Sequence, residues 1–170
     1  MNRRQLNIGI VALGITACQQ VGTAPSSADG MLILDTYQIT ASQETEVQYR
    51  MLDSVNALRI ENGLGVVAFD EGLNAAAAIH SRDMARQDRP WLFGSDGSTP
   101  IDRAQRAGFA GRLLGENVSE TYETELQTLD AWMSQNETRS IILAAEARSM
   151  GFAWFQEQDG RLWWTLNMGS

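Results

Sequence analysis

The 170-residue sequence contains no lysine, and its 13 arginines stand against 21 acidic residues, which gives a formal net charge of −8. An acidic chain without a basic patch excludes nucleic acid as an expected partner. One cysteine excludes an internal disulfide, so packing alone must stabilise the fold. One histidine, His80, leaves too few ligands for an ordinary zinc site. The 44% hydrophobic content predicts a single globular domain, and we expect no cofactor.

The N-terminal segment has the features of an export signal. Residues 8–17 are apolar and follow two arginines. This run is too short to span a bilayer, but it has the length of a signal-peptide core. Its end, Ile15-Thr16-Ala17-Cys18, resembles a bacterial lipobox, in which signal peptidase II cleaves before a lipidated cysteine. We therefore expect a lipoprotein signal peptide over residues 1–17. The alternative is an ordinary secretory signal followed by an incidental cysteine.

Cleavage before Cys18 has two consequences. The mature chain loses Arg3 and Arg4, so its formal charge changes from −8 to −10. The residue after the cysteine is Gln19 rather than aspartate, which in a diderm cell implies sorting to the outer membrane. The resemblance thus predicts an extracytoplasmic protein held on the periplasmic face of that membrane by its N-terminal lipid.

Residues 18–42 are expected to link the lipidated cysteine to the folded domain. Residues 19–30 are small and polar, with glycine, proline and serine, and this composition is typical of a flexible tether. Residues 31–39, MLILDTYQI, are too apolar for a tether. They are either an extra strand or an extended segment that lies on the domain. The domain itself is placed over residues 43–170.

Apolar residues at helical spacing predict two long helices. The first begins near Ser42 and can end at Gly63. Its buried face consists of Val47, Met51, Val55 and Leu58. The second begins after Asp70, a residue type suited to the N-cap. Its buried stripe consists of Leu73, Ala77, His80 and Met84.

Two further helices are expected before the C-terminal part of the chain. A short one follows Thr99-Pro100, because proline is favoured in the first turn of a helix. Another runs from about Thr121 to Ser134, and its apolar side consists of Leu126, Leu129 and Met133.

Asp159-Gly160 lies between two aromatic runs and predicts a two-residue β-hairpin turn. That turn would pair Phe155 with Trp164, Trp154 with Thr165, and Gln156 with Trp163. Large apolar side chains then lie on both faces of the sheet, and each face needs a covering layer of helices. We therefore predict an α+β fold, a three-layer α-β-α sandwich around a mainly antiparallel sheet.

Six short motifs occur in an order and at spacings that are specific in combination. They are LNAAAAIHSRDMA (73–85), GSDGSTPIDRAQRAGF (94–109), GENV (115–118), AWM (131–133), RSIIL (139–143) and GFAW (151–154). Together they resemble the CAP superfamily, the SCP domain of cysteine-rich secretory, antigen 5 and pathogenesis-related proteins, in its bacterial form. The resemblance covers roughly residues 44–168 and implies an α-β-α sandwich.

Many CAP domains carry two histidines and two glutamates around a central cleft that can hold a divalent metal. In this sequence the glutamate of the GEN motif is Glu116. By position in the motifs, Leu92 takes the place of the first histidine, Gln135 that of the second glutamate, and Thr138 that of the second histidine. The resemblance therefore implies a degenerate cleft, for which we expect no metal.

The remaining polar residues allow other chemical assignments. His80 lies on an apolar stripe, which favours a hydrogen-bonded core histidine over a ligand or base. A Ser-His-Asp triad would need that histidine to face a nucleophile, but Ser81 is its helix neighbour and no G-x-S-x-G motif is present. Residues 95–98 lack the spaced acids of a calcium loop and are expected to form a turn. Trp91 is expected at the cleft mouth, where it could contact an apolar ligand.

These observations favour a lipid-anchored envelope CAP domain that acts as a non-catalytic binding or structural module. Its expected contacts are the membrane, through the N-terminal lipid, and a lipid, an envelope polymer or a protein as ligand. The alternative is a hydrolase that uses Glu116 and a water molecule, although a lone glutamate lacks a second group to polarise the substrate. For Glu116 we expect a structural role, with a partner such as the backbone of its own loop, a tryptophan indole, or an arginine such as Arg139.

Overall fold

The computed structural model describes residues 37–121 and 123–170. The predicted signal peptide, Cys18 and residues 19–36 lie outside the described residues. Within the described part, helices and strands follow one another along the chain in this order: α1 (Glu44–Glu61), β1 (Ala68–Phe69), α2 (Glu71–Gln87), α3 (Pro100–Arg106), β2 (Leu113–Thr121), α4 (Glu125–Ser134), α5 (Asn136–Ile142), β3 (Ser149–Gln156) and β4 (Leu162–Gly169). None of the described helices has the length and apolar character needed to cross a membrane.

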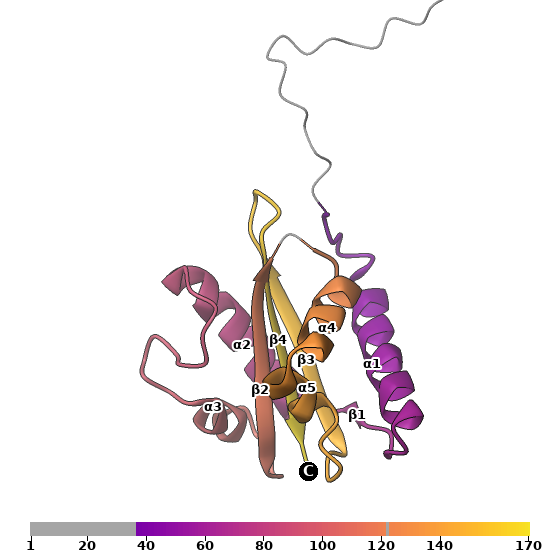
Figure 1. The fold of residues 1–170 in the computed structure, drawn as a ribbon. Helices are drawn as coiled ribbons and strands as arrows, with labels where there is room; N and C mark the ends of the chain where they lie inside the picture. Colours follow the sequence, from indigo (N-terminus) through magenta and orange to yellow (C-terminus); the bar gives the residue numbers. More distant parts are fainter. Residues whose placement is uncertain (1–36, 122) are drawn as a thin grey trace, which may run out of the picture. The chain divides into compact units, whose positions relative to one another are not determined.

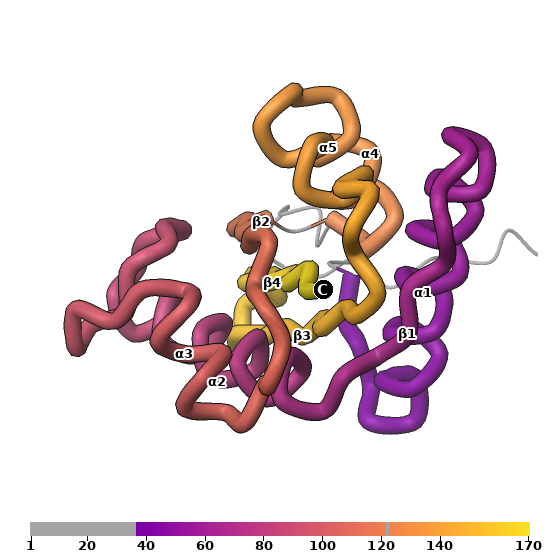
Figure 2. Tube along the Cα trace, turned by 90° about the horizontal axis from the view of Figure 1, so that it is seen from below, coloured from indigo at the N-terminus to yellow at the C-terminus, as the bar shows by residue number. Residues whose placement is uncertain are grey.

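A four-stranded sheet forms the middle layer, with strand order β1-β3-β4-β2. The short β1 pairs with β3 in parallel, whereas β3–β4 and β2–β4 are antiparallel. Helices α4 and α5, with α1 beside α4, cover one face, and α2 with α3 covers the other (Figure 1). Figure 2 shows the strands between α4–α5 and α2. The predicted three-layer α+β sandwich is therefore confirmed.

Capping residues set the helix starts, as the sequence indicates. The Asp70 carboxylate accepts a hydrogen bond from the Leu73 amide, 2.9 Å away, at the start of α2. At the start of α3, Thr99 forms a capping box with Asp102. The predicted stripe of α2 is fully buried. Each cap satisfies an amide that has no partner inside its helix, so the sequence determines where these helices begin.

The two faces of the sheet are packed differently. The face toward α1, α4 and α5 carries the bulky core, in which the rings of Phe152 and Trp164 stack with centroids 5.4 Å apart. Along the middle of the sheet, the face toward α2 carries small or polar residues such as Gly151 and Thr165, with Trp163 nearer the β3–β4 turn. A Cβ atom on Gly151 would lie 2.3 Å from the carbonyl carbon of Leu73. The absence of a side chain at Gly151 therefore lets α2 approach the sheet closely.

The hairpin register differs from the prediction by one residue. Trp154 lies opposite Trp164, and Phe155 lies opposite Trp163. The Glu157 amide donates to the Arg161 carbonyl, and the Gly160 amide donates to the Glu157 carbonyl. The loop thus has three residues rather than two, with Gly160 at φ 93°. A type I turn closed by a left-handed glycine is a common three-residue hairpin, and the extra residue shifts every pair.

Helix α4 also differs from its predicted form. It begins at Glu125 instead of near Thr121, because β2 continues through Thr121 and Thr124 provides a capping box with Gln127. Leu126 is exposed, and the buried face of this helix consists of Glu125, Thr128, Leu129 and Trp132. A buried Glu125 requires partners, and Tyr37 and Arg50 provide them.

The chain before α1 lies on the domain. The Tyr37 hydroxyl donates to Glu125 at 3.0 Å, and Arg50 donates to the other oxygen of the same carboxylate at 2.8 Å. The Gln156 amide bonds both the Tyr37 carbonyl and the Ile39 amide. Residues 37–39 therefore form an extended segment without strand pairing, which decides between the two alternatives for this part of residues 31–39.

Candidate functional site

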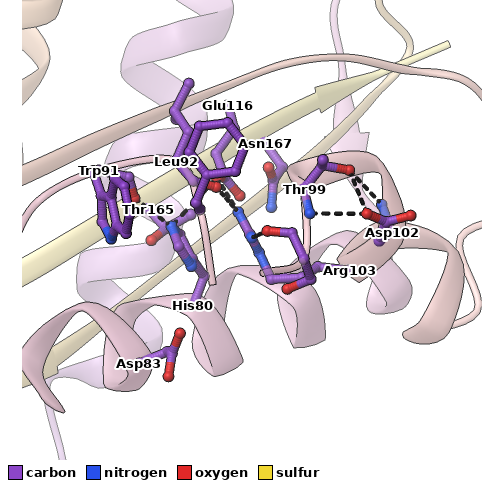
Figure 3. Close-up of polar contacts among 12 residues, drawn as sticks. His80, Asp83, Trp91, Leu92, Thr99, Asp102, Arg103, Glu116, Thr165 and Asn167 are labelled. Carbon is purple, nitrogen blue, oxygen red and sulfur yellow. Dashed lines mark hydrogen bonds and ion pairs between the residues drawn. The ribbon is translucent and has the colours of Figure 1, made fainter. Parts of the chain in front are cut away.

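Glu116 lies in the middle of β2, opposite Asn167 of β4, and not in a loop as the sequence was interpreted. Its side chain is only 1% exposed and points toward the α2–α3 layer (Figure 3). Side chains alternate along a strand, so the neighbouring Asn117 points to the opposite layer. There its amide donates to the Thr138 carbonyl at 3.0 Å. Glu116 is thus a buried carboxylate on the edge strand β2, and it lies on the face of the sheet that α2 and α3 cover.

Arg103 of α3 is the main partner of this carboxylate. Its Nη2 lies 2.6 Å from Glu116 Oε1, and the arginine side chain is only 5% exposed. The same guanidinium donates to the carbonyls of Leu92 and Ser98, at 2.9 and 3.0 Å. The partner is thus an arginine, one of the expected kinds, but it is Arg103 and not Arg139, which bonds Met133 and Asn136 on the other side of the sheet. A charge-assisted hydrogen bond of this length is among the stronger kinds in proteins.

His80 of α2 forms a buried polar cluster with Glu116 and Arg103. Its Nε2 lies 2.8 Å from the Trp91 carbonyl and 3.6 Å from Glu116 Oε1. A carbonyl can only accept, so Nε2 carries the proton. Burial, and next the positive charge of Arg103, lower the pKa of His80 to about 4. The ring is therefore neutral at pH 7, and its contact with Glu116 is not an ion pair. This arrangement is the hydrogen-bonded core histidine that its apolar stripe predicts.

The electrostatic balance at Glu116 is dominated by desolvation. Burial raises the pKa of Glu116 to about 7, whereas Arg103 and, more weakly, the Asn167 amide across the strand pair lower it. Removal from water disfavours the charged form, and one arginine offsets only part of that cost. Within the described chain, Glu116 Oε2, His80 Nδ1, Arg103 Nε and Asn167 Oδ1 are buried without a hydrogen-bond partner. The cluster is thus costly to bury and incompletely satisfied.

The cluster also fixes a loop. His80 holds the Trp91 carbonyl, and Arg103 holds the carbonyls of Leu92 and Ser98. Farther along α2, Asp83 accepts from the amide and the hydroxyl of Ser95, at 2.7 and 2.6 Å. The backbone of residues 91–98 is therefore bound to α2 and α3 by buried polar side chains. Residues 95–98 form a turn, as expected.

The four cleft positions do not form one polar site. The side chain of Leu92 is exposed, and only its carbonyl reaches the cluster, through Arg103. Thr138 lies in α5 on the other layer, where its hydroxyl donates to the Trp132 carbonyl. Gln135 is exposed at the junction of α4 and α5. Of the other three cleft positions, only Leu92 is connected to Glu116. The connection runs from the Leu92 backbone carbonyl through Arg103.

A divalent metal does not fit these residues. The Arg103 guanidinium lies against Glu116 Oε1, so a positive group already occupies the position that a metal would need. In residues 37–121 and 123–170, no three His, Cys, Asp or Glu side chains are grouped so as to hold an ion. A pocket of about 220 Å³ beside Arg103 contains Asp83 and Asp96, but both carboxylates bond neighbouring arginines. The donor set favours an internal ion pair over metal binding.

Arg103 was missed by sequence reasoning as a site residue, although it lies inside one of the motifs. Helical spacing offers a signal for it: Arg103 and Ala104 are the buried residues of the short α3. A buried arginine needs a carboxylate or several carbonyls, and Glu116 was the acid for which we expected burial.

Comparison with known proteins now identifies the fold family. Residues 52–168 match the model of the CAP family, described as the cysteine-rich secretory protein family. The chain belongs to the CAP family. This CAP chain is also 24% identical over 140 residues to the uncharacterized protein YkwD of Bacillus subtilis. The match covers 82% of this chain and 52% of YkwD, so the chain spans about half the length of that curated relative.

Two solved structures have a fold similar to that of this chain. An outer surface protein of Borrelia burgdorferi has a TM-score of 0.68 at 14% identity, over 79% of this chain and 98% of that protein. An extracellular SCP-domain protein of Bacillus anthracis has a TM-score of 0.69 at 21% identity, over 78% of this chain and 44% of that protein. At these identities the likeness shows the fold alone. The match to the family model confirms the CAP resemblance inferred from the motifs.

Proposed function

We propose that this CAP domain is a lipid-anchored, extracytoplasmic module of the bacterial cell envelope that binds or supports a partner and does not catalyse a reaction. The observation that carries this proposal is the buried pair of Glu116 and Arg103. The only glutamate at a family cleft position is 1% exposed, and its oxygen is bound by a guanidinium. A group in that state is not available to a metal or to an attacking water.

The envelope location is supported by two independent observations. The N-terminal segment has the apolar core of a signal peptide and ends in the lipobox-like Ile15-Thr16-Ala17-Cys18. Two of the proteins with a similar fold are described as an outer surface protein and an extracellular protein. A lipid on Cys18 and sorting to the periplasmic face of the outer membrane belong to the same proposal. So does the class of ligand, which is a lipid, an envelope polymer or a protein.

A hydrolase that uses Glu116 is the second candidate. Two observations favour it: the pKa of Glu116 is raised to about 7, and the neutral His80 lies 3.6 Å away. A carboxyl group with such a pKa is suited to proton transfer near neutral pH. The enclosure of the side chain stands against this role, because a substrate must reach a general base within hydrogen-bond distance.

Zinc titration tests the proposal. Calorimetry of the purified chain should give no stoichiometric zinc binding, and zinc should not raise the melting temperature beyond a non-specific effect. Asp96→Asn is the matched control, since it removes an exposed carboxylate outside the cluster. A one-to-one zinc signal that survives in this control and disappears in Glu116→Ala would contradict the non-catalytic assignment.

A further inference from the structure

Strand β2 forms one edge of the sheet, and every second residue of it directs its backbone N–H and C=O groups away from β4. Arg112 and Ser170 exchange both of their backbone hydrogen bonds, so Ser170 faces β2. Backbone groups alternate in direction along a strand, so every second residue of β4 from Leu162 to Met168 faces β2 as well. Their partners on β2 are Gly115, Asn117, Ser119 and Thr121. The residues between these partners face outward, and they are Glu116, Val118 and Glu120.

The second half of this strand is accessible from the side. Val118 is half-buried and Glu120 is exposed, whereas Glu116 is buried. Among residues 37–121 and 123–170, none bonds the outward backbone groups of Val118 or Glu120. Figure 2 shows β2 at one end of the row of strands, with β1 at the other end. We call residues 118–121 the open edge. Unpaired N–H and C=O groups along a strand are a template for pairing with a further strand.

The opposite edge of the sheet is covered by the chain itself. Strand β1 pairs with the start of β3. Farther along β3, the Phe152 amide donates to Asn74 at 2.8 Å, and Gln48 donates to the Phe152 carbonyl at 3.4 Å. At the end of β3, the Gln156 side chain bonds residues 37–39. Proteins cover strand edges in such ways to prevent unwanted pairing. The open edge of β2 differs, because its outward backbone groups are left for a partner.

The open edge carries an incompletely compensated negative charge. The side chains of Val118 and Glu120 lie on the face of the sheet toward α2, because side chains alternate along β2. Glu120 lies 3.4 Å from Arg161, but that guanidinium binds Asp88 and Glu157 more closely, at 2.7 and 2.6 Å. Three carboxylates thus share one cation. A basic side chain opposite Glu120 would therefore be favoured over an acidic one.

An exposed apolar loop lies near the same face of the sheet. The Arg103 guanidinium binds both Glu116 Oε1 and the Leu92 carbonyl, so the loop after α2 lies beside β2 (Figure 3). Leu92 is 42% exposed and Phe93 is 48% exposed. Exposed apolar residues that are grouped on a surface mark a contact site. This loop can receive an apolar side chain from a strand added next to Val118.

We infer that the open edge binds an extended segment of a partner protein by β-strand addition, with an apolar residue of the segment opposite Val118 and a basic residue opposite Glu120. The inference deepens the proposed function, since it rests on the module's binding a partner. In this mode of recognition, main-chain hydrogen bonds provide affinity and alternate side chains provide specificity. A second copy of the chain fits less well, because each copy has a net charge of −8 and would bring its own Glu120 to the edge.

A labelled peptide tests the inference on the full chain with Cys18→Ser. The probe is TVTRTVTR, which as a strand places valine and arginine on one face. Fluorescence anisotropy should show saturable binding. Only alternate amides of a strand face its neighbour, so two N-methylated forms serve as matched controls. Methylation of the valines and arginines, or of the threonines, should abolish binding in one form and spare it in the other. Equal binding by both forms, or no saturable binding of the unmethylated probe, would overturn the inference.

Charge variants separate recognition at the edge from general attraction to an acidic chain. Glu120→Arg should weaken binding of the probe by about fivefold, because an attractive cross-strand pair becomes a repulsive one. Glu61→Arg makes the same change of charge at the exposed end of α1 and should leave binding unchanged. Equal weakening by the two variants would contradict recognition at the open edge.

Hydrogen exchange locates the bound probe. The amides of Val118 and Glu120 should exchange more slowly when the probe is bound, while those of Asn117 and Ser119 face β4 and are protected without it. Protection that leaves Val118 and Glu120 unchanged would overturn the inference. So would protection of both amides that grows with the concentration of the chain alone, since a second copy would then be the occupant. The zinc titration is independent of these measurements, so a probe that fails to bind leaves the non-catalytic assignment standing.

Discussion

At the scale of single residues, Glu116 is a buried carboxylate that one arginine partly compensates. A carboxylate taken out of water costs several kcal/mol, and one well-placed arginine returns a comparable amount. The raised pKa of Glu116 indicates that desolvation prevails over Arg103. The pair therefore contributes little net stability compared with an apolar replacement, but either member alone is costly. We conclude that the pair specifies where α3 and residues 91–98 lie against β2.

Truncation of Glu116 should destabilise the domain. Glu116→Ala leaves Arg103 buried without its carboxylate and should lower the free energy of unfolding by about 1–3 kcal/mol. Glu116→Gln keeps an acceptor at Oε1 and the same shape, so it should cost less. Glu120→Ala, on the same strand but with a partly exposed side chain, should change stability by no more than about 0.5 kcal/mol. Urea unfolding of the three variants measures these differences. If both Glu116 variants unfold like the parent while a hydrolytic activity disappears, the carboxylate is catalytic.

The pH dependence of stability should separate Glu116 from His80. The folded state raises the pKa of Glu116 from 4.5 to about 7, so this group's stabilising contribution is present below pH 4.5 and is lost as pH rises through 7. The folded state lowers the pKa of His80 from 6.5 to about 4, so its contribution is present above pH 6.5 and is lost as pH falls through 4. Between pH 4.5 and 6.5 the two effects oppose each other.

Glu116→Gln removes one of these two effects. As pH rises from 4.5 through 7, the stability of the parent relative to Glu116→Gln should fall by on the order of 3 kcal/mol. Carboxylates elsewhere titrate in both chains and cancel in the difference. Chemical denaturation at a series of pH values measures it. A difference that stays constant with pH would mean that Glu116 keeps an ordinary pKa in the fold.

At the scale of elements, the close contact between α2 and β3 depends on a residue with no side chain. A Cβ at Gly151 would meet the Leu73 carbonyl carbon at 2.3 Å and its oxygen at 2.4 Å, and backbone atoms cannot move aside as side chains do. Gly151→Ala should therefore destabilise by about 1–3 kcal/mol, although alanine ordinarily suits a strand better than glycine. Gly65→Ala, where the nearest atom is 4.0 Å away, is the control and should be nearly neutral. Thermal melts of both variants provide the comparison.

Element positions could be predicted from the sequence where the signal is local. Asp70 and the Thr99-Pro100 pair mark helix starts because a capping side chain bonds the helix that it precedes. The hairpin register could not be predicted from Asp159-Gly160, since that pair is compatible with a two-residue and a three-residue loop. The difference is decided by the Glu157–Arg161 closure, which includes a salt bridge between their side chains at 2.6 Å.

Of the candidate site, Glu116 could be predicted from the sequence, but its partner could not. The motif order identified Glu116, and its burial and structural pairing followed from the cost of an unpaired carboxylate. The partner could not be read from the sequence, because Arg103 and Glu116 meet only when α3 packs against β2. Arg139 was an equally plausible cation, but it lies in α5, and the Glu116 side chain points to the opposite face of the sheet, where α3 lies. Partner identity in this domain is a tertiary property and leaves no local pattern.

At the scale of the whole molecule, the pair of Glu116 and Arg103 connects three parts of the α2–α3 side of the sandwich. Glu116 lies on β2 and Arg103 lies on α3, and the same guanidinium binds the carbonyls of Leu92 and Ser98 in the loop after α2. A buried ion pair at this cleft position therefore fixes residues 91–98 against the sheet.

The proposed attachment of the chain to a membrane depends on Cys18. Cys18→Ser should leave an unlipidated precursor, because signal peptidase II acts on a lipobox whose cysteine has been modified, and the acyl mass should be absent from the N-terminus. Fractionation of cells that express the parent and the variant, with mass spectrometry of the mature N-terminus, measures this. Ser27→Ala, a substitution in the predicted tether, is the control and should leave the chain in the membrane fraction. A soluble parent protein with an unmodified N-terminus at another residue would show that the export signal is an ordinary secretory one.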